Sequence, residues 1–173
     1  MEIIKTKKFI LRSISLKDAK DLAKNMNNWN VMKNLSQIPF PYELKHARQF
    51  SGKMEKQMKK EKTENYVMVI EIDEEVVGAV GAHHIVHDHK AEMGYWLAEK
   101  HWGRGIMSEA VKKFMAHVFT KFKLRRIYAY AYPFNKGSVR VMEKVGMQFE
   151  GIGRKDVIKD GKFLDSHIYA KIK

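Results

Sequence analysis

The segment Trp102-Gly103-Arg104-Gly105-Ile106-Met107-Ser108 lies between a run of strand-forming residues and a helical pattern. Its two glycines let the backbone curl without Cβ clashes, so several amide N–H groups and the positive end of the following helix converge on one point. A pyrophosphate suits such a point, and Arg104 or Lys112 would add charge outside the loop. A lone Gly-x-Gly is also typical of an ordinary tight turn.

Secondary-structure patterns extend in both directions from this segment. Hydrophobic periodicity and capping residues predict a strand, two amphipathic helices, three strands, a helix, a strand, a helix and two strands. In residue numbers these are strand 8–14, a helix that starts at Ser15 with a capping box to Asp18, a helix through 47–58, strands 66–72, 76–86 and 92–97, a helix through 103–122, strand 126–132, helix 135–144 and two strands within 149–172. This mixture predicts an α+β fold, with a mixed, mostly antiparallel sheet of about seven strands flanked by about four helices.

Bulk composition limits the classes of protein to consider. The chain has 173 residues, 45% of them hydrophobic, which is enough for one core, so residues 1–173 are expected to form a single domain. The absence of cysteine excludes disulfides and a cysteine nucleophile. No apolar run approaches the roughly 20 residues of a membrane span, so we expect a cytoplasmic protein without a membrane partner. A net charge of +13 predicts attraction to polyanions but indicates no specific nucleic acid.

Two sequence blocks indicate a family. The chain has no P-loop motif, and Gly103-x-Gly105 lacks the third glycine of a dinucleotide fingerprint. Instead, Ala91-Glu92-Met93-Gly94-Tyr95-Trp96-Leu97 followed by Trp102-Gly103-Arg104-Gly105 resembles the cofactor segment of the GNAT acetyltransferase superfamily. Asn135-x-x-Ser138-x-Arg140-Val141-Met142-Glu143-Lys144-x-Gly146 is similar to the next block of that family, in the branch with ribosomal-protein N-terminal acetyltransferases. The resemblance covers nearly the whole chain.

The resemblance implies acetyl-coenzyme A as cosubstrate and no metal. It implies that the strand with Tyr95 separates from the strand at 126–132, so that freed backbone groups hold the pantetheine arm, with irregular pairing near Gly94 as the local sign. Asn135 would hold the same arm, or would simply cap the next helix. The implied cofactor-binding residues are Tyr95, Trp96, Leu97, Trp102, Gly103, Arg104, Gly105, Ile106, Met107, Asn135 and Ser138.

Catalytic roles are implied for three residues. Ser138 matches a serine proposed in this branch to protonate the departing thiolate, although a serine in a first helical turn is often only a cap. Tyr132 and Tyr130 are alternative proton donors. An amine attacks only when it is unprotonated, so a base is required, and Glu92 stands where several family members carry one. The alternative bases are Glu71 and His84, and a solvated carboxylate is the ordinary interpretation of Glu92.

The histidines at 83, 84, 87 and 89 suggest a metal site only if the strand runs straight through them, and polar turn residues are the preferred interpretation. Without a cysteine, direct transfer in a ternary complex is expected. The expected acceptor is the α-amine of a ribosomal-protein-like N-terminus, and association with the ribosome is expected. Alternatives are a polyamine, amino sugar or antibiotic amine, or a non-catalytic binding module. The expected assembly is a monomer or a homodimer.

Overall fold

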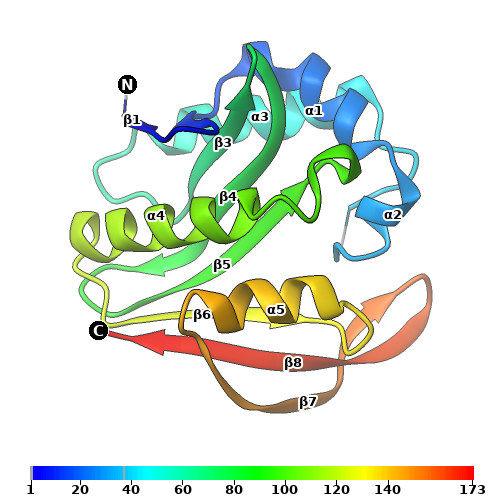
Figure 1. Cartoon of the computed structure of the whole chain (residues 1–173), viewed down its shortest axis with the longest axis vertical. Coiled ribbons are helices and arrows are strands. Elements are labelled where there is room, and N and C mark those ends of the chain that lie inside the picture. Colours follow the sequence, from blue (N-terminus) through cyan, green and yellow to red (C-terminus); the bar gives the residue numbers. More distant parts are fainter. Residues whose placement is uncertain (1, 37) are drawn as a thin grey trace.

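The computed structural model describes residues 2–36 and 38–173, and its centre is a mixed sheet of eight strands (Figure 1). The strand order is β1-β2-β3-β4-β5-β6-β8-β7. Among the strands of the described residues, only the β5–β6 pair is parallel. The strands are β1 (Ile3–Lys5), β2 (Ile10–Ser13), β3 (Tyr66–Ile72), β4 (Glu75–Val86), β5 (Lys90–Leu97), β6 (Arg126–Ala131), β7 (Gln148–Lys159) and β8 (Lys162–Ile172). The α+β prediction of a mostly antiparallel sheet is therefore confirmed.

Helices cover both faces of this sheet. They are α1 (Ala19–Met26), α2 (Trp29–Met32), α3 (Leu44–Gln57), α4 (Ile106–Lys121) and α5 (Lys136–Lys144), with short 3-10 turns η1 (Leu16–Asp18) and η2 (Glu99–His101). On one face, Phe114 of α4 and Met142 of α5 pack on Met68 of β3 and its neighbours. On the other face, Leu22 of α1 and Ala47 of α3 pack on Val69 and its neighbours. Among the described residues, none of the helices has the length and apolarity of a membrane crossing.

The strand and helix counts differ from the sequence prediction at the N-terminal end. The expected strand 8–14 is the second arm of a hairpin, because Ile3–Lys5 pairs antiparallel with Ile10–Ser13. Three residues are too few to show an alternating pattern, so this strand was missed. One additional helix, α2, consists of a single turn, and its Asn28 cap accepts a hydrogen bond from the Asn30 N–H. A single turn likewise carries no periodic signal.

The parallel strands β5 and β6 separate shortly after they meet. Their pairing covers only Lys90 with Arg126, Ala91 with Ile127 and Glu92 with Tyr128. Beyond that point β5 continues to Leu97 and β6 to Ala131 without pairing to each other, and α4 and α5 lie over the two sides of the opening (Figure 1). The separation expected from the resemblance is therefore present in the structure.

The prediction of irregular pairing near Gly94 is wrong. Gly94 pairs in register with Gly81 of β4, and the irregularity lies between His83 and Val86, where His84 has a φ of 48°. The physical reason is that β5 leaves its partner on one side only. The β4 side stays fully hydrogen-bonded while the β6 side opens, so no bulge is needed at Gly94.

Candidate functional site

The loop before α4 presents a row of free amides. Gly103 and Gly105 have φ values of 75° and 74°, a left-handed conformation that favours glycine. The indole N–H of Trp102 donates to the Leu97 carbonyl oxygen at 2.7 Å and anchors the turn. Six consecutive N–H groups, from 103 to 108, have no acceptor among residues 2–36 and 38–173. With the positive end of the 16-residue helix behind them, these amides form an anion-binding site.

A lysine from the other end of the chain lies beside this loop. The Lys8 ammonium donates to the Arg104 carbonyl oxygen at 3.3 Å, and it would be 4.0 Å from a Cβ placed on Gly105. Arg104 itself turns toward the His101 ring, with 3.2 Å between Nη1 and Nδ1. Lys112 is exposed on α4. Lys8 could not be predicted from the sequence, because 96 residues separate it from Arg104 along the chain.

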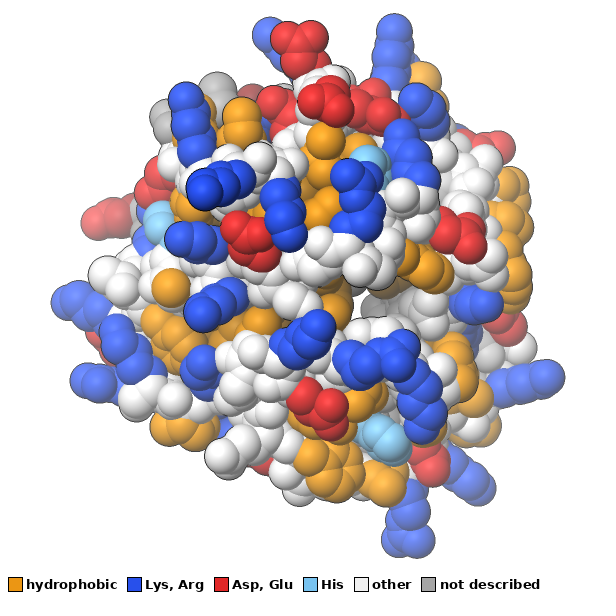
Figure 2. All heavy atoms as spheres, in the orientation of Figure 1, with side chains coloured by type: hydrophobic (Ala, Val, Ile, Leu, Met, Phe, Trp, Pro, Cys, Tyr) orange, Lys and Arg blue, Asp and Glu red, His pale blue; other side chains and the backbone are white. Residues whose placement is uncertain are grey.

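The cleft between β5 and α5 brings both sequence blocks together. Asn135 accepts a hydrogen bond from the Ser138 N–H at 3.1 Å, so it is the expected N-cap of α5. Its Nδ2 group has no partner among the described residues. The Tyr95 hydroxyl lies 2.8 Å from Ser138 Oγ, and burial raises the pKa of Tyr95 to about 12. Figure 2 shows a narrow hollow between the surface over α4 and the surface over α5, with lysine and arginine side chains around it.

A second group of residues lies on the opposite face of the sheet. Glu92 and Tyr128 are opposed across the last parallel pair, so their side chains point to one face, and Tyr130 follows on the same face. The Glu92 carboxylate lies 3.2 Å from Nδ1 of His84. Burial, together with the Glu92 charge, raises the pKa of the Tyr128 and Tyr130 phenols. Both phenols are therefore protonated and able to donate a hydrogen bond at neutral pH.

A bulge in the last hairpin adds another carboxylate to this face. Pairing between β7 and β8 shifts between Gly153 and Val157, and the unpaired Asp156 accepts a 2.6 Å hydrogen bond from the buried Ser166 hydroxyl. Its charge helps to raise the pKa of Tyr130, after burial of the phenol itself. Asp156 was missed because only the curled hairpin brings it near β6, and a bulge leaves no clear mark in the sequence.

The α2 segment borders the same face and is held from two sides. Glu99 of η2 accepts hydrogen bonds from the Asn28 and Asn30 side chains at 2.8 and 2.9 Å. Lys159, at the tip of the β7–β8 hairpin, donates to the Met32 and Leu35 carbonyl oxygens at 3.3 and 2.6 Å. In Figure 1 this tip lies below α2 at the right of the view. The open face is thus bordered by α2, β7 and β8.

Two predicted candidates lie away from this open face. Glu71 is held by Arg12, whose Nε lies 2.6 Å from the carboxylate. Along β4, the partners of Glu71 and Glu92 are seven residues apart, or roughly 23 Å at strand spacing. Tyr132 is buried, its ring stacks on Phe134 at 5.1 Å between centroids, and its hydroxyl has no partner among the described residues.

The histidine cluster does not converge. His83 Nδ1 lies 2.9 Å from Asn65 Oδ1, His84 contacts Glu92, and His87 Nε2 lies 3.2 Å from the Thr63 carbonyl oxygen. The irregular pairing after His83 sends these rings in different directions. Within the part of the chain that the structure describes, no three histidine or acidic side chains share a metal position.

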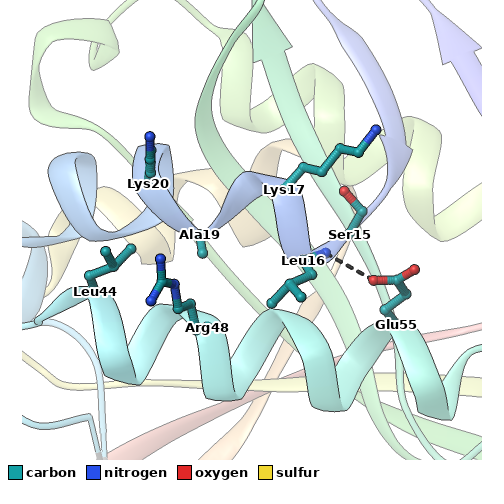
Figure 3. Close-up of a pocket in the computed structure, with 8 residues that line it drawn as sticks. All are labelled: Ser15, Leu16, Lys17, Ala19, Lys20, Leu44, Arg48 and Glu55. Carbon is teal, nitrogen blue, oxygen red and sulfur yellow. Dashed lines mark hydrogen bonds between the residues drawn. The ribbon is translucent and has the colours of Figure 1, made fainter.

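A separate groove of about 630 Å³ lies between α1 and α3 (Figure 3). The Glu55 carboxylate accepts a hydrogen bond from the Leu16 N–H at 2.9 Å. The groove is also lined by Lys17, Lys20 and Arg48. The residues of the amide loop, of the β5–β6 opening and of the face with Glu92 do not line this groove. We therefore assign it no part in the chemistry.

The sheet opens between two parallel strands, with free amides at one end of the opening and protonatable side chains beside it. This combination is typical of an acyl-coenzyme A-dependent acyltransferase. The chain belongs to the GNAT acetyltransferase family, because the model of the acetyltransferase (GNAT) domain matches residues 8–148. It is thus an acetyltransferase enzyme, which counts against the alternative of a non-catalytic binding module.

Known proteins similar to this chain carry related names. A probable N-acetyltransferase, YjcK of Bacillus subtilis, is 30% identical over 97% of this chain and 96% of its own length. The ribosomal-protein-serine acetyltransferase of Escherichia coli is 31% identical over 58% of this chain and 56% of its own length. The microcin C7 self-immunity acetyltransferase MccE, solved with acetyl-CoA and AMP, has the same fold, with a TM-score of 0.87 and 23% identity over 97% of this chain and 94% of its own.

Proposed function

We propose that this enzyme transfers an acetyl group from acetyl-coenzyme A to the α-amine of a protein N-terminus in the cytoplasm, by direct attack within a ternary complex. The observation that carries the proposal is the position of the six free amides at one end of the β5–β6 opening, with Glu92 on the face beyond it. A phosphorylated cosubstrate on one side and an ammonium on the other account for both features.

The cosubstrate is assigned to the opening itself. Its pyrophosphate would accept hydrogen bonds from the amides of Gly103 to Met107, with Lys8 adding positive charge. The pantetheine arm would lie along the unpaired edge of Tyr95, Trp96 and Leu97, in place of a missing strand. The free Nδ2 group of Asn135 would donate a hydrogen bond to an amide carbonyl of that arm.

The chemistry requires one bond to form and one to break. The acceptor nitrogen attacks the thioester carbon, the new C–N bond forms and the C–S bond breaks, and the thiolate takes a proton. Ser138 is assigned as the donor of that proton, since its hydroxyl lies at the cleft beside Tyr95. Glu92 is assigned to the acceptor side, where it attracts the ammonium and accepts its proton directly or through water.

The choice of an N-terminal acceptor rests on charge and access. The chain carries a net charge of +13, yet the acceptor face holds the carboxylates of Glu92 and Asp156. Local negative charge selects an ammonium, while the overall positive charge disfavours free polyamines and favours substrates associated with an acidic particle such as the ribosome. The similarity to the ribosomal-protein-serine acetyltransferase supports the same choice.

A small amine, such as a polyamine, an amino sugar or an antibiotic amine, is the second candidate acceptor, because the carboxylates of Glu92 and Asp156 would attract any ammonium. A thiol-release assay with acetyl-coenzyme A separates the two. Peptides with free and with blocked α-amines would be compared with polyamines and amino sugars. Release with the free peptides but not the blocked ones supports the proposal, whereas release with small amines alone would overturn it. Free coenzyme A should appear without a burst, since no acyl-enzyme forms.

A further inference from the structure

His83 is a mostly buried imidazole that no part of the proposed chemistry uses. It is opposed to Glu92 in the β4–β5 register, so both side chains project from the same face of the sheet. The ring extends along the sheet over the glycine pair Gly81 and Gly94. A Cβ on Gly81 would meet its Nε2 at 2.8 Å, and a Cβ on Gly94 would meet the ring at 3.7 Å. Two opposed glycines thus leave room for one imidazole where β5 has just left β6.

The hydrogen bond to Asn65 fixes which nitrogen of His83 carries the proton. The Asn65 Oδ1 atom, 2.9 Å from Nδ1, can only accept a hydrogen bond. Nδ1 therefore carries the proton, and Nε2 presents its lone pair. No hydrogen bond from the described residues reaches Nε2, and Nε2 is not fully enclosed. A neutral imidazole with one nitrogen held by a second residue and the other free is the arrangement of a general base.

We propose that Nε2 of His83 is a proton acceptor for the incoming amine. This inference rests on the proposed function and refines it: His83 takes the proton that was assigned there to Glu92, and Glu92 keeps the role of attracting the ammonium. The acceptor arrives as an ammonium and gives one proton to Nε2, which later returns it to solvent. The neutral amine then attacks the thioester carbon, and its second proton ends on the leaving thiolate. Glu92, which already contacts His84, holds the ammonium close to His83. The proton balance therefore closes without a metal or an oxidant.

The surroundings of the ring favour a neutral imidazole at working pH. Burial lowers the pKa of His83, and the neighbouring His84 lowers it further. The other groups around the ring are the Glu92 carboxylate on β5, the Tyr128 phenol beyond it on β6, and the uncharged Asn65 and Val67 on the β3 side. A lowered pKa keeps the His83 imidazole unprotonated in most molecules at neutral pH, so that Nε2 is available to accept a proton.

The pH profile of kcat/KM tests this role with a free N-terminal peptide as acceptor. In the wild-type enzyme, kcat/KM should fall as the pH is lowered and His83 becomes protonated; this fall is the acid limb of the profile. His83→Gln should lower turnover at neutral pH by about 100-fold and remove this acid limb. Asn65→Asp places a carboxylate against Nδ1, so the limb should move upward by about one pH unit. The matched control is His89→Gln, an exposed histidine for which neither change is expected.

The outcomes separate this inference from the proposed function. A wild-type enzyme that releases no thiol with any peptide would count against the function itself. An active wild type, with an unchanged acid limb in His83→Gln, would overturn the role of His83 alone. Should Glu92→Gln move the limb while Asn65→Asp leaves it in place, the titrating base is Glu92. Because Asn65→Asp retains His83, it tests the proposal even if His83→Gln folds poorly.

Discussion

The hydroxyl of Tyr95 lies 2.8 Å from Ser138 Oγ and 3.2 Å from the Ser138 carbonyl oxygen, so one phenol joins strand β5 to helix α5 across the opening. A carbonyl oxygen only accepts, and burial raises the pKa of Tyr95 to about 12, so Tyr95 is the donor in the contact with the carbonyl. The contact fixes the orientation of Ser138 before any substrate binds.

Tyr95→Phe and Ser138→Ala are expected to lower turnover through one shared step. Each single variant should reduce kcat by about 10- to 100-fold with a smaller effect on cofactor affinity, and the double variant should be little worse than Ser138→Ala. Steady-state kinetics with a double-mutant cycle measures this coupling. Tyr132→Phe should keep full turnover, because its buried hydroxyl has no hydrogen-bond partner among the described residues. If Ser138→Ala keeps turnover and Tyr132→Phe loses it, the proton donor is the tyrosine.

Gly105→Val should abolish coenzyme A binding. The φ of 74° is costly for a β-branched residue, by about 1–3 kcal/mol, and its relief would turn the amides away from the anion. Gly161→Val is the matched control, because Gly161 has a φ of 73° in the β7–β8 turn, far from the amide row. Calorimetric titration of both variants with coenzyme A separates loss of the site from loss of stability. Equal affinity for the two would contradict the assignment of the loop.

Lys8→Gln is expected to weaken coenzyme A binding about fivefold and to reduce its dependence on salt, because a positive charge beside the phosphates is lost. The neighbouring Lys7 is exposed, and its side chain has no hydrogen bond to the loop among the described residues, so Lys7→Gln should behave as wild type. Titrations at two salt concentrations provide the measurement. Wild-type affinity of the Lys8→Gln variant for coenzyme A at low salt would show that Lys8 does not contribute to the phosphate site.

Asn135 has two separable functions. Asn135→Ala loses both the helix cap and the free amide group, so we expect a loss of about 1 kcal/mol in stability and weaker coenzyme A binding. Asn135→Asp keeps the capping oxygen and loses only the Nδ2 donor, so stability should be retained while affinity falls. Thermal unfolding together with calorimetric titration distinguishes the two effects. Wild-type affinity of Asn135→Asp for coenzyme A would show that Asn135 only caps the helix and does not bind the cofactor.

Glu92→Gln should raise the KM for the acceptor and lower turnover at neutral pH, while affinity for coenzyme A stays unchanged. The substitution keeps the shape of the side chain but removes the charge that attracts the ammonium. Activity should recover at high pH, where the amine is already deprotonated. The measurement is the pH dependence of both kinetic constants, with Glu71→Gln as a carboxylate control paired to Arg12. A wild-type KM and pH profile in Glu92→Gln would show that Glu92 is an ordinary strand residue with no role in the reaction.

Local sequence patterns determined most of the architecture. Amphipathic stripes, the capping box at Ser15 and the turn at Asp160-Gly161 are interactions among residues close along the chain, and the elements they predict are present within a few residues. The free amides before α4 belong to the same class, because two glycines with positive φ and a helix start are encoded within one segment. The Asn135 cap was also readable, since the cap and Ser138 are three residues apart.

Tertiary structure alone decided which distant side chains meet. Lys8 reaches the amide loop through the β1–β2 hairpin, Asp156 reaches β6 through a bulge in a curled hairpin, and Asn65 fixes the tautomer of His83 from its position just before β3. These contacts depend on strand register and sheet order, which shift by whole residues when a bulge or a short strand is added. No local pattern carries that information, so the sequence predicts the binding loop, while only the packed sheet determines the charges and bases around it.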